Sequence, residues 1–130
     1  MSMMMIDTPL IRGLGRVLDR SAFRHQVISA NLANVDTPGY RTRDIREFAG
    51  EIERAMAGGD EPLFAGQLAS FSPVARTVHG LLERPDGNNV SVERESLLLA
   101  QNQLRFEAGV QFLKAEFHRL STAINGGSTS

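Results

Sequence analysis

The residue types that most often carry chemistry are few in this 130-residue chain. His25, His79 and His118 are the only histidines, and the chain has no cysteine, so the ligand spacing of a zinc site is missing. No serine stands in a Gly-x-Ser-x-Gly turn, and the glycines form neither a phosphate-binding loop nor a dinucleotide-binding pattern. The sequence therefore predicts no catalytic residue, no metal site and no cofactor, and it favours a protein that is not an enzyme.

Four arginines recur at every fourth position near the N-terminus: Arg12, Arg16, Arg20 and Arg24. On a helix they would share one face, where like charges repel one another by a few tenths of a kcal/mol per pair. One interpretation is a solvated face. A second is a charge stripe that meets carboxylates of neighbouring subunits. A membrane-surface contact is a third, less favoured because the opposite side lacks an aromatic wedge.

The distribution of charge along the chain supports the second interpretation. Fourteen basic and fifteen acidic residues give a formal net charge of −1, which argues against a nucleic-acid partner, whose phosphates favour clustered Lys and Arg. Residues 1–46 carry seven Arg against four Asp, whereas residues 47–130 carry seven basic and eleven acidic side chains. Opposite ends of one chain, or of neighbouring chains, can therefore attract each other.

The element that would hold the arginines is a long helix, predicted over residues 8–35. Thr8 can cap free amides at its start, and Pro9 suits the first helical position. Its seam alternates in steps of three and four, the spacing of a coiled coil, with two polar interruptions. The seam residues are Ile11, Leu14, Leu18, Ser21, His25, Ile28, Leu32 and Val35.

A second long helix is predicted over residues 91–125. Ser91 can cap it, and Glu93 and Glu95 place negative charge on its first turn, which complements the helix dipole. Gly126 and Gly127 are expected to end it. Its seam consists of Val92, Ser96, Leu99, Gln103, Phe106, Val110, Leu113, Phe117, Leu120 and Ile124.

Further apolar residues make this second face wider than one partner helix needs: Leu97, Leu98, Leu104, Ala108 and Phe112. One interpretation is a closed monomeric bundle, in which a short helix covers the excess. The other, which we favour, is contact with several other subunits at once.

The middle of the chain carries weaker signals. A short amphipathic helix is predicted from the spacing of Ile45, Phe48, Ile52 and Met56. Residues 58–90 contain three prolines and several glycines, and are expected to be irregular, with a small β-hairpin around Pro85-Asp86-Gly87-Asn88. The expected fold is therefore all-α and a single domain over residues 1–130, in which the terminal helices form a coiled-coil hairpin and residues 36–90 connect them.

A turn is expected directly after the first helix. Pro38 disfavours the α conformation in the residue before it, and Pro-Gly suits the centre of a type II turn, in which Gly39 takes a positive φ. The side-chain amides of Asn31 and Asn34 can bond backbone groups where the helix ends.

This turn and a second block of residues resemble the family of bacterial flagellar rod and hook proteins, in which a helix ends in Asn-x-x-Asn and a Thr-Pro-Gly-aromatic turn. The first motif consists of Asn31, Leu32, Ala33, Asn34, Asp36, Thr37, Pro38, Gly39 and Tyr40. The second opens the C-terminal helix and consists of Asp86, Gly87, Asn88, Asn89 and Val90, followed by Glu93 and Glu95. Residues 75–79 resemble a family stretch more loosely.

The resemblance covers residues 10–48 and 74–125, and the chain looks most like a proximal rod protein. The short middle segment leaves no room for the outer domain of distal rod and hook proteins. The second block of residues distinguishes this chain from another proximal rod protein. The resemblance implies terminal helices that assemble into a hollow axial structure, which transmits torque and encloses an export channel. The assembly seam would consist of Leu14, Leu18, Ile28, Leu32, Phe106, Val110, Leu113, Phe117, Leu120 and Ile124.

The implied partners are further copies of the chain, other rod proteins, the adaptor protein FliE, and the membrane ring and export gate at the rod base. Export through the flagellar type III apparatus into the periplasmic rod, without a cleaved signal peptide, is also implied. The N-terminus agrees, because it lacks a basic start and an apolar region of roughly 7–15 residues. The alternative function is a non-enzymatic helical-hairpin adaptor or secretion chaperone, which a stable, discrete dimer would favour.

Overall fold

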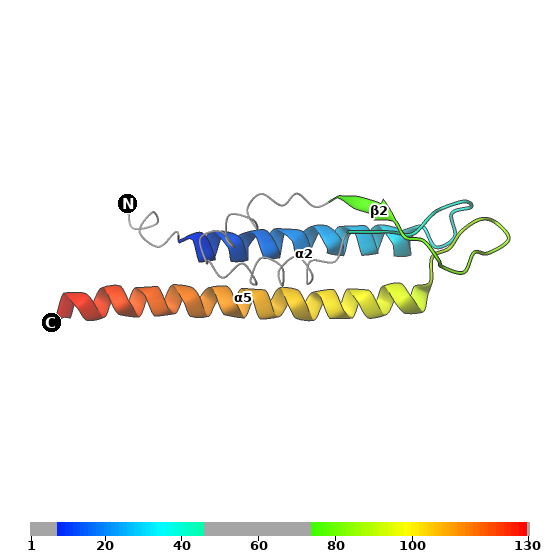
Figure 1. The fold of residues 1–130 in the computed structure, drawn as a ribbon. Helices are drawn as coiled ribbons and strands as arrows, with labels where there is room; N and C mark the ends of the chain where they lie inside the picture. The colour runs from blue at the N-terminus through cyan, green and yellow to red at the C-terminus, as the bar shows by residue number, and fades with distance from the viewer. Residues whose placement is uncertain (1–7, 46–73, 130) are drawn as a thin grey trace. The chain divides into compact units, whose positions relative to one another are not determined.

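The computed structural model describes residues 8–45 and 74–129, which form two long helices and two short strands (Figure 1). In chain order these are helix α2 (Pro9–Ala33), strand β1 (Arg43–Ile45), strand β2 (Ala75–Thr77) and helix α5 (Val92–Thr129). The expected fold, largely all-α with long N- and C-terminal helices, is confirmed. Ile45 belongs to β1 and not to the expected middle helix, because its backbone pairs with Ala75. The other residues of that helix lie outside the described residues.

The chain divides into two compact units, and each long helix contributes to both. Of the described residues, 8–19 and 107–129 belong to the helical unit, and 20–45 and 74–106 belong to the motif unit. A single domain over the whole chain stays a prediction.

The start of α2 follows the expected capping pattern. The backbone N–H of Ile11 donates to Thr8 Oγ1 at 3.2 Å, and that of Arg12 donates to the Thr8 carbonyl at 3.0 Å. Such bonds satisfy amides that have no partner within the helix.

The end of α2 is set by the residues that follow it. The Asn34 side chain donates to the Ala30 carbonyl at 2.7 Å and so competes for a helical acceptor. The Tyr40 N–H then donates to the Thr37 carbonyl at 3.2 Å, and Gly39 has a φ of 75°. These are the features of a type II turn, so that prediction is confirmed.

Helix α5 begins as expected but ends later. Ser91 caps it, because the Arg94 N–H donates to Ser91 Oγ at 3.2 Å. The helix continues to Thr129, past Gly126 and Gly127, so the expectation that these glycines end it is wrong. A glycine ends a helix by adopting a positive φ, and the described glycines that do so are Gly39, Gly80 and Gly87. A helical glycine costs only about 1 kcal/mol relative to alanine.

The sheet joins segments that are far apart in the sequence. Strands β1 and β2 pair antiparallel, with Arg43 opposite Thr77 and Asp44 opposite Arg76. The expected turn at residues 84–88 is present, with the Arg84 N–H bonded to the Asn88 carbonyl at 2.8 Å. However, no strand of the described chain flanks that turn, so the expected hairpin position is wrong. Three-residue strands are too short to pair by themselves, and their partners are set by the surrounding contacts.

The helix faces that are covered differ in part from the predicted seams. The buried and half-buried positions of α5 include a regular set with steps of four and three: Glu95, Leu99, Asn102, Phe106, Gly109, Leu113, Glu116 and Leu120. Half of this set was predicted. The predicted seam positions that are exposed are Val92, Ser96, Gln103, Phe117 and Ile124 on α5 and His25 on α2. The prediction counted apolar residues and therefore missed polar and small residues on the covered face.

Each unit has its own helix-to-helix contact. In the motif unit, Asn102 Nδ2 donates to the Ser21 carbonyl at 2.8 Å, and the Asn31 amide contacts Glu95, so the two helices run antiparallel there. In the helical unit, a Cβ atom on Gly109 would lie 2.7 Å from Leu18 Cδ2, so glycine permits close packing. The buried polar residues outnumber the buried apolar ones in the motif unit, and its core is therefore unusually polar.

Candidate functional site: two interlocked motifs

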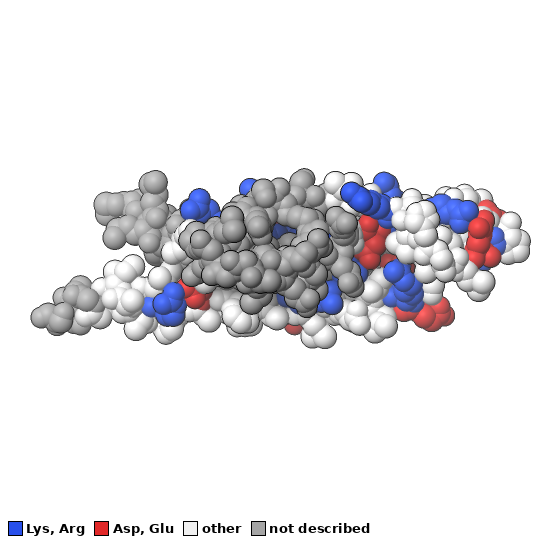
Figure 2. Space-filling view, viewed as in Figure 1, with Lys and Arg blue, Asp and Glu red and all other residues white. Residues whose placement is uncertain are grey.

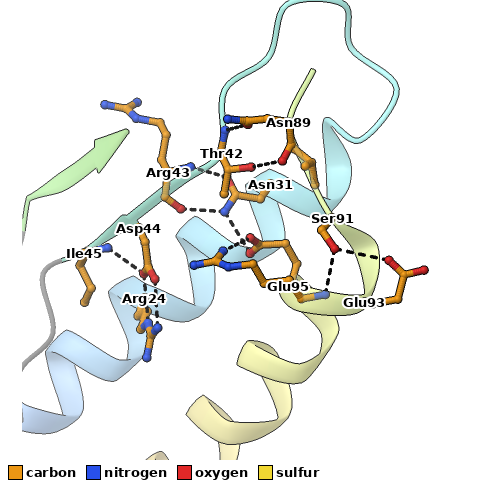
Figure 3. Close-up of polar contacts among 12 residues, drawn as sticks. Arg24, Asn31, Thr42, Arg43, Asp44, Ile45, Asn89, Ser91, Glu93 and Glu95 are labelled. Carbon is orange, nitrogen blue, oxygen red and sulfur yellow. Dashed lines mark hydrogen bonds and ion pairs between the residues drawn. The ribbon is translucent and has the colours of Figure 1, made fainter. Parts of the chain in front are cut away.

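The two sequence motifs meet in the motif unit, and Asn31 is at the centre of their contact (Figure 3). Its side chain is fully buried on the last turns of α2. Nδ2 donates to the Arg43 carbonyl at 2.7 Å and to Glu95 Oε2 at 3.1 Å, while Oδ1 accepts from the Arg43 N–H and the Tyr40 hydroxyl, each at 3.1 Å. All the bonding positions of the amide are used, so Asn31 ties α2, the segment after the turn and α5 together.

Asn88, in the second motif, likewise connects distant segments through its side-chain amide. It is fully buried, and its Nδ2 donates to the carbonyls of Asn34 and Thr37, each at 2.9 Å. Its Oδ1 accepts from the Val90 N–H at 2.8 Å. The carbonyls of Asn34 and Thr37, which follow the end of α2 and also accept backbone N–H groups of the turn, thus receive a further hydrogen bond each from the second motif.

A third set of bonds runs through Thr42 and Asn89. The Thr42 N–H donates to Asn89 Oδ1 at 2.6 Å, and the Thr42 hydroxyl donates to the Asn89 carbonyl at 3.2 Å (Figure 3). Both residues are buried. Thr42 was not predicted as a site residue, because a threonine beyond a turn carries no distinctive sequence signal.

The two turns approach each other at their glycines. The Gly39 N–H donates to the Asp86 carbonyl at 2.9 Å. Gly87 has a φ of 86°, and a Cβ atom there would lie 3.3 Å from the Gly39 Cα. Glycine is therefore required at position 87 for its conformation and for the close contact. We call the contacts of Asn34, Thr37, Gly39 and Tyr40 with residues 86–89, together with the hydrogen bond between Asn31 and Glu95, the motif interlock.

Charged groups border the interlock. Glu95 is fully buried, and Arg94 Nη1 donates to its Oε1 at 2.8 Å, so the carboxylate is paired. Burial raises the pKa of Tyr40 above its ordinary value of 10.0; the nearby Arg43 charge opposes this rise and Glu95 adds to it. The Arg84 guanidinium also donates to the carbonyl of Val35, which joins the second turn to the end of α2.

The predicted arginine stripe is divided by the fold. Arg24 makes a two-bond ion pair with Asp44 of the same chain, at 3.0 Å for each bond, and Arg20 is buried. One of the four arginines is thus buried and another is half-buried in an ion pair, so the four do not form one exposed stripe. Arg12 and Arg16 are exposed, and for them the interpretation as a contact between subunits stays a prediction. On the face drawn in Figure 2, basic and acidic side chains of the described residues lie interspersed.

Not every predicted motif residue takes part in these contacts. Leu32 is half-buried, whereas Ala33, Asp36 and Pro38 are exposed. Sequence reasoning also missed Arg43, whose backbone bonds Asn31, and Asn102, whose side chain bonds the Ser21 carbonyl. Asn102 stands seven residues after Glu95, and this repeat of polar residues at helical spacing is a signal that could have been found.

The arrangement is suited to holding chain segments together. Its side chains are mainly amides and hydroxyls that bond backbone groups. Within residues 8–45 and 74–129, no group of three or more His, Cys, Asp or Glu could hold a metal ion. No described helix is long and apolar enough to cross a membrane.

Comparisons with known proteins agree with this structural role. The family model for "Flagella basal body rod protein" matches residues 21–41, which include the whole first motif. The chain is similar to the flagellar basal body rod protein FlgB of Salmonella typhimurium, with 32% identity over 124 residues that cover 85% of this chain and 89% of that one. The FlgB protein of Escherichia coli is 30% identical over 124 residues, which cover 85% of this chain and 89% of that one. The FlgB protein of Bacillus subtilis is 29% identical over 123 residues, which cover 90% of this chain and 94% of that one.

Proposed function

Since the chain belongs to the FlgB family of flagellar basal body rod proteins and is a structural subunit of the proximal rod, we propose how it acts there. Its terminal helices associate with those of neighbouring subunits into a hollow axial structure, which transmits torque and encloses the export channel. The motif interlock is the joint that holds the two helices of each subunit together under load.

The interlock is the observation that supports this proposal. It connects the end of α2 to the start of α5 through buried hydrogen bonds, including those of Asn31 and Asn88. Fully satisfied buried polar networks make a joint rigid and fix one arrangement of its parts. A subunit that transmits torque needs such a joint. Large apolar side chains of α5 meanwhile remain exposed and available to other subunits: Leu97, Leu104, Phe112, Phe117 and Ile124.

The family membership implies assembly with other rod components of the basal body. We extend this to the adaptor FliE, the membrane ring and the export gate at the rod base. Export through the flagellar type III apparatus without a cleaved signal peptide belongs to the same proposal. For Arg12 and Arg16 we propose contacts with carboxylates of neighbouring subunits. The adaptor or secretion-chaperone alternative is not favoured, because the relatives are rod proteins.

The proposal is tested by expressing the full chain, with an affinity tag, in cells that lack their own copy of the protein. We expect motility, and we expect the tagged chain in purified basal bodies at the membrane-proximal end of the rod. A motile strain whose basal bodies lack the chain would contradict the proposal.

The role of the interlock is tested by a matched pair of glycine variants. Gly80 and Gly87 have almost equal positive φ values, 83° and 86°, so alanine costs about 1–2 kcal/mol at either position. Only at Gly87 does the added Cβ also meet the backbone of the first turn; at Gly80 nothing lies within 4 Å. Gly87→Ala should therefore reduce rod formation much more than Gly80→Ala, scored by basal bodies in electron micrographs. Equal effects would contradict the role of the interlock.

A further inference from the structure

The motif unit contains two exposed leucines of α5, one helical heptad apart. Leu97 is 59% exposed and Leu104 is 67% exposed. They are seven residues apart, which places them on one face of the helix. Glu95 and Asn102, which contact α2, lie on the opposite face of α5. We call Leu97 and Leu104 the leucine ridge.

The outward face of α2 in the same unit has the opposite character. Its side chains are mostly small and carry no carboxylate or guanidinium. We call this set the small-residue face; it consists of the exposed residues Ala22, Gln26, Ser29, Ala30 and Ala33. Ala22 stands nine residues before the buried Asn31, which is two and a half helical turns, so the face points away from α5.

We infer that the leucine ridge of one subunit packs on the small-residue face of a second copy of the same chain. The inference rests on the proposed function, for which it names the partner and the surfaces. The two surfaces are complementary in size, because alanine and serine leave depressions between them that leucine side chains can fill. They also match in spacing, since Ala22 and Ser29 are separated by seven residues, as are Gln26 and Ala33.

The distribution of charge supports a packed interface. Exposed helix faces in water usually carry charged residues, whereas the centres of protein interfaces are depleted of them. Among the exposed residues of α2 from Ala22 to Ala33, His25 at the edge is the only one that can become charged. Between the two leucines, the exposed residues of α5 are Ala100, Gln101 and Gln103, all of them uncharged.

The partner is a second copy because both surfaces belong to one chain and point in opposite directions. Each subunit can therefore bind one neighbour through its ridge and another through its small-residue face. Such a contact between two different surfaces does not close on itself as a symmetric dimer does, and it can continue into a ring or a helical array. A continuing contact of this kind is what a rod subunit requires.

Cysteine cross-linking tests the inference directly, because the chain has no cysteine of its own. Two differently tagged full-length variants, Ser29→Cys and Leu97→Cys, are expressed together in cells without the wild-type protein and treated with a short bifunctional maleimide. We expect cross-links between the two variants, in basal bodies, with few cross-links between two copies of the same variant. Predominant Leu97→Cys pairs with themselves would overturn the inference in favour of a symmetric contact.

The matched control is Ser96→Cys, which is exposed on the neighbouring position of α5 about a quarter turn away. We expect Ser29→Cys to cross-link at least about tenfold more with Leu97→Cys than with Ser96→Cys, because cross-linking requires that the two cysteines lie close together, and residue 96 is turned by about 100° around the helix from residue 97. Equal yields would overturn the inference. So would cross-links from Leu97→Cys that lead only to other rod proteins, although the chain would then still be a rod subunit. Absence of the chain from basal bodies would instead contradict the proposed function.

A second test replaces both leucines of the leucine ridge by polar residues and measures incorporation into basal bodies. Leu97→Gln combined with Leu104→Gln should leave the motif unit folded, because both side chains face solvent in the subunit. The variant should be secreted normally, and it should lose most incorporation into basal bodies. Wild-type incorporation of this variant would overturn the inference.

Discussion

Asn31 illustrates how single residues hold this subunit together. An amide can make at most four hydrogen bonds with its side chain, and the buried Asn31 makes all four. A buried polar group that loses its partners costs about 1–3 kcal/mol, more when charge is involved. The network is therefore sensitive to changes that are small in volume but alter donors and acceptors.

Asn31→Asp is the sharpest test at this scale. The substitution keeps the size of the side chain but removes both donors and places a carboxylate beside that of Glu95. We expect a loss of about 3–5 kcal/mol in the free energy of unfolding of the motif unit. Urea unfolding followed by circular dichroism measures it. Gln111→Glu, the same chemical change at an exposed site of α5, should cost much less, and equal losses would contradict the role of Asn31.

Tyr40 makes the interlock sensitive to high pH. Burial raises its pKa above 10.0 in the folded chain, so between 10 and the raised value the folded state keeps a proton that the unfolded state has released. Stability is therefore unaffected below pH 10 and falls as the pH rises above it. Because Tyr40 is the only tyrosine, the ultraviolet absorbance of tyrosinate reports its titration directly. A titration midpoint at or below 10 would contradict this prediction. Tyr40→Phe should remove the part of the stability loss above pH 10 that is due to Tyr40.

At the scale of elements, α5 presents chemically different residues on one covered face. Glu95 and Asn102 bond α2 in the motif unit, whereas Gly109 permits close packing against Leu18 in the helical unit. The apolar positions of the same face include Leu99, Phe106, Leu113 and Leu120, which are half-buried. Helix packing in this subunit therefore depends on hydrogen bonds and small residues as well as on apolar burial.

Leu113 and Lys114 distinguish the covered face of α5 from its exposed face. Leu113 is half-buried and Lys114 is exposed. Leu113→Asp should therefore prevent rod formation, because a partly buried, unpaired carboxylate costs about 2 kcal/mol or more in each subunit. Lys114→Asp should have a much smaller effect. Secreted protein and basal bodies are scored for each variant; secretion without rods indicates an assembly defect, and equal effects would show that the assigned face is wrong.

At the scale of the whole molecule, stabilising contacts are distributed unevenly between the two units. The motif unit contains most of the described buried residues, among them Ile28, Asn31, Thr42, Asn88 and Glu95. In the described part of the helical unit the buried residues are Ile11 and Gly13. The motif unit should consequently be the more stable part of an isolated subunit.

Hydrogen exchange can measure this difference along a single helix. In the isolated subunit, backbone amides of α5 at residues 107–126 should exchange about tenfold faster or more than those at residues 96–106. In purified basal bodies both segments should be protected, because neighbouring subunits then cover the exposed side chains. Uniform protection along α5 in the isolated subunit would contradict the prediction.

The sequence by itself was enough to predict the features that depend on neighbouring residues. The caps at Thr8 and Ser91 and the turn at Gly39 follow from interactions over three or four residues. The two long helices follow from apolar spacing, and the family from two short motifs. Each of these signals is contained in a continuous segment, so it can be read without knowing what the segment contacts.

Only the tertiary structure showed what the motifs do. Asn31 and Glu95 are 64 residues apart, and Thr42 and Asn89 are 47 apart, and no local pattern predicts such pairs. The pairing of β1 with β2 and the polar half of the α5 face were missed for the same reason. A polar residue is expected at the surface unless its partners are known, because burial of an amide or carboxylate is favourable only when hydrogen bonds replace those with water. Those partners come from distant segments, and the fold alone brings them together.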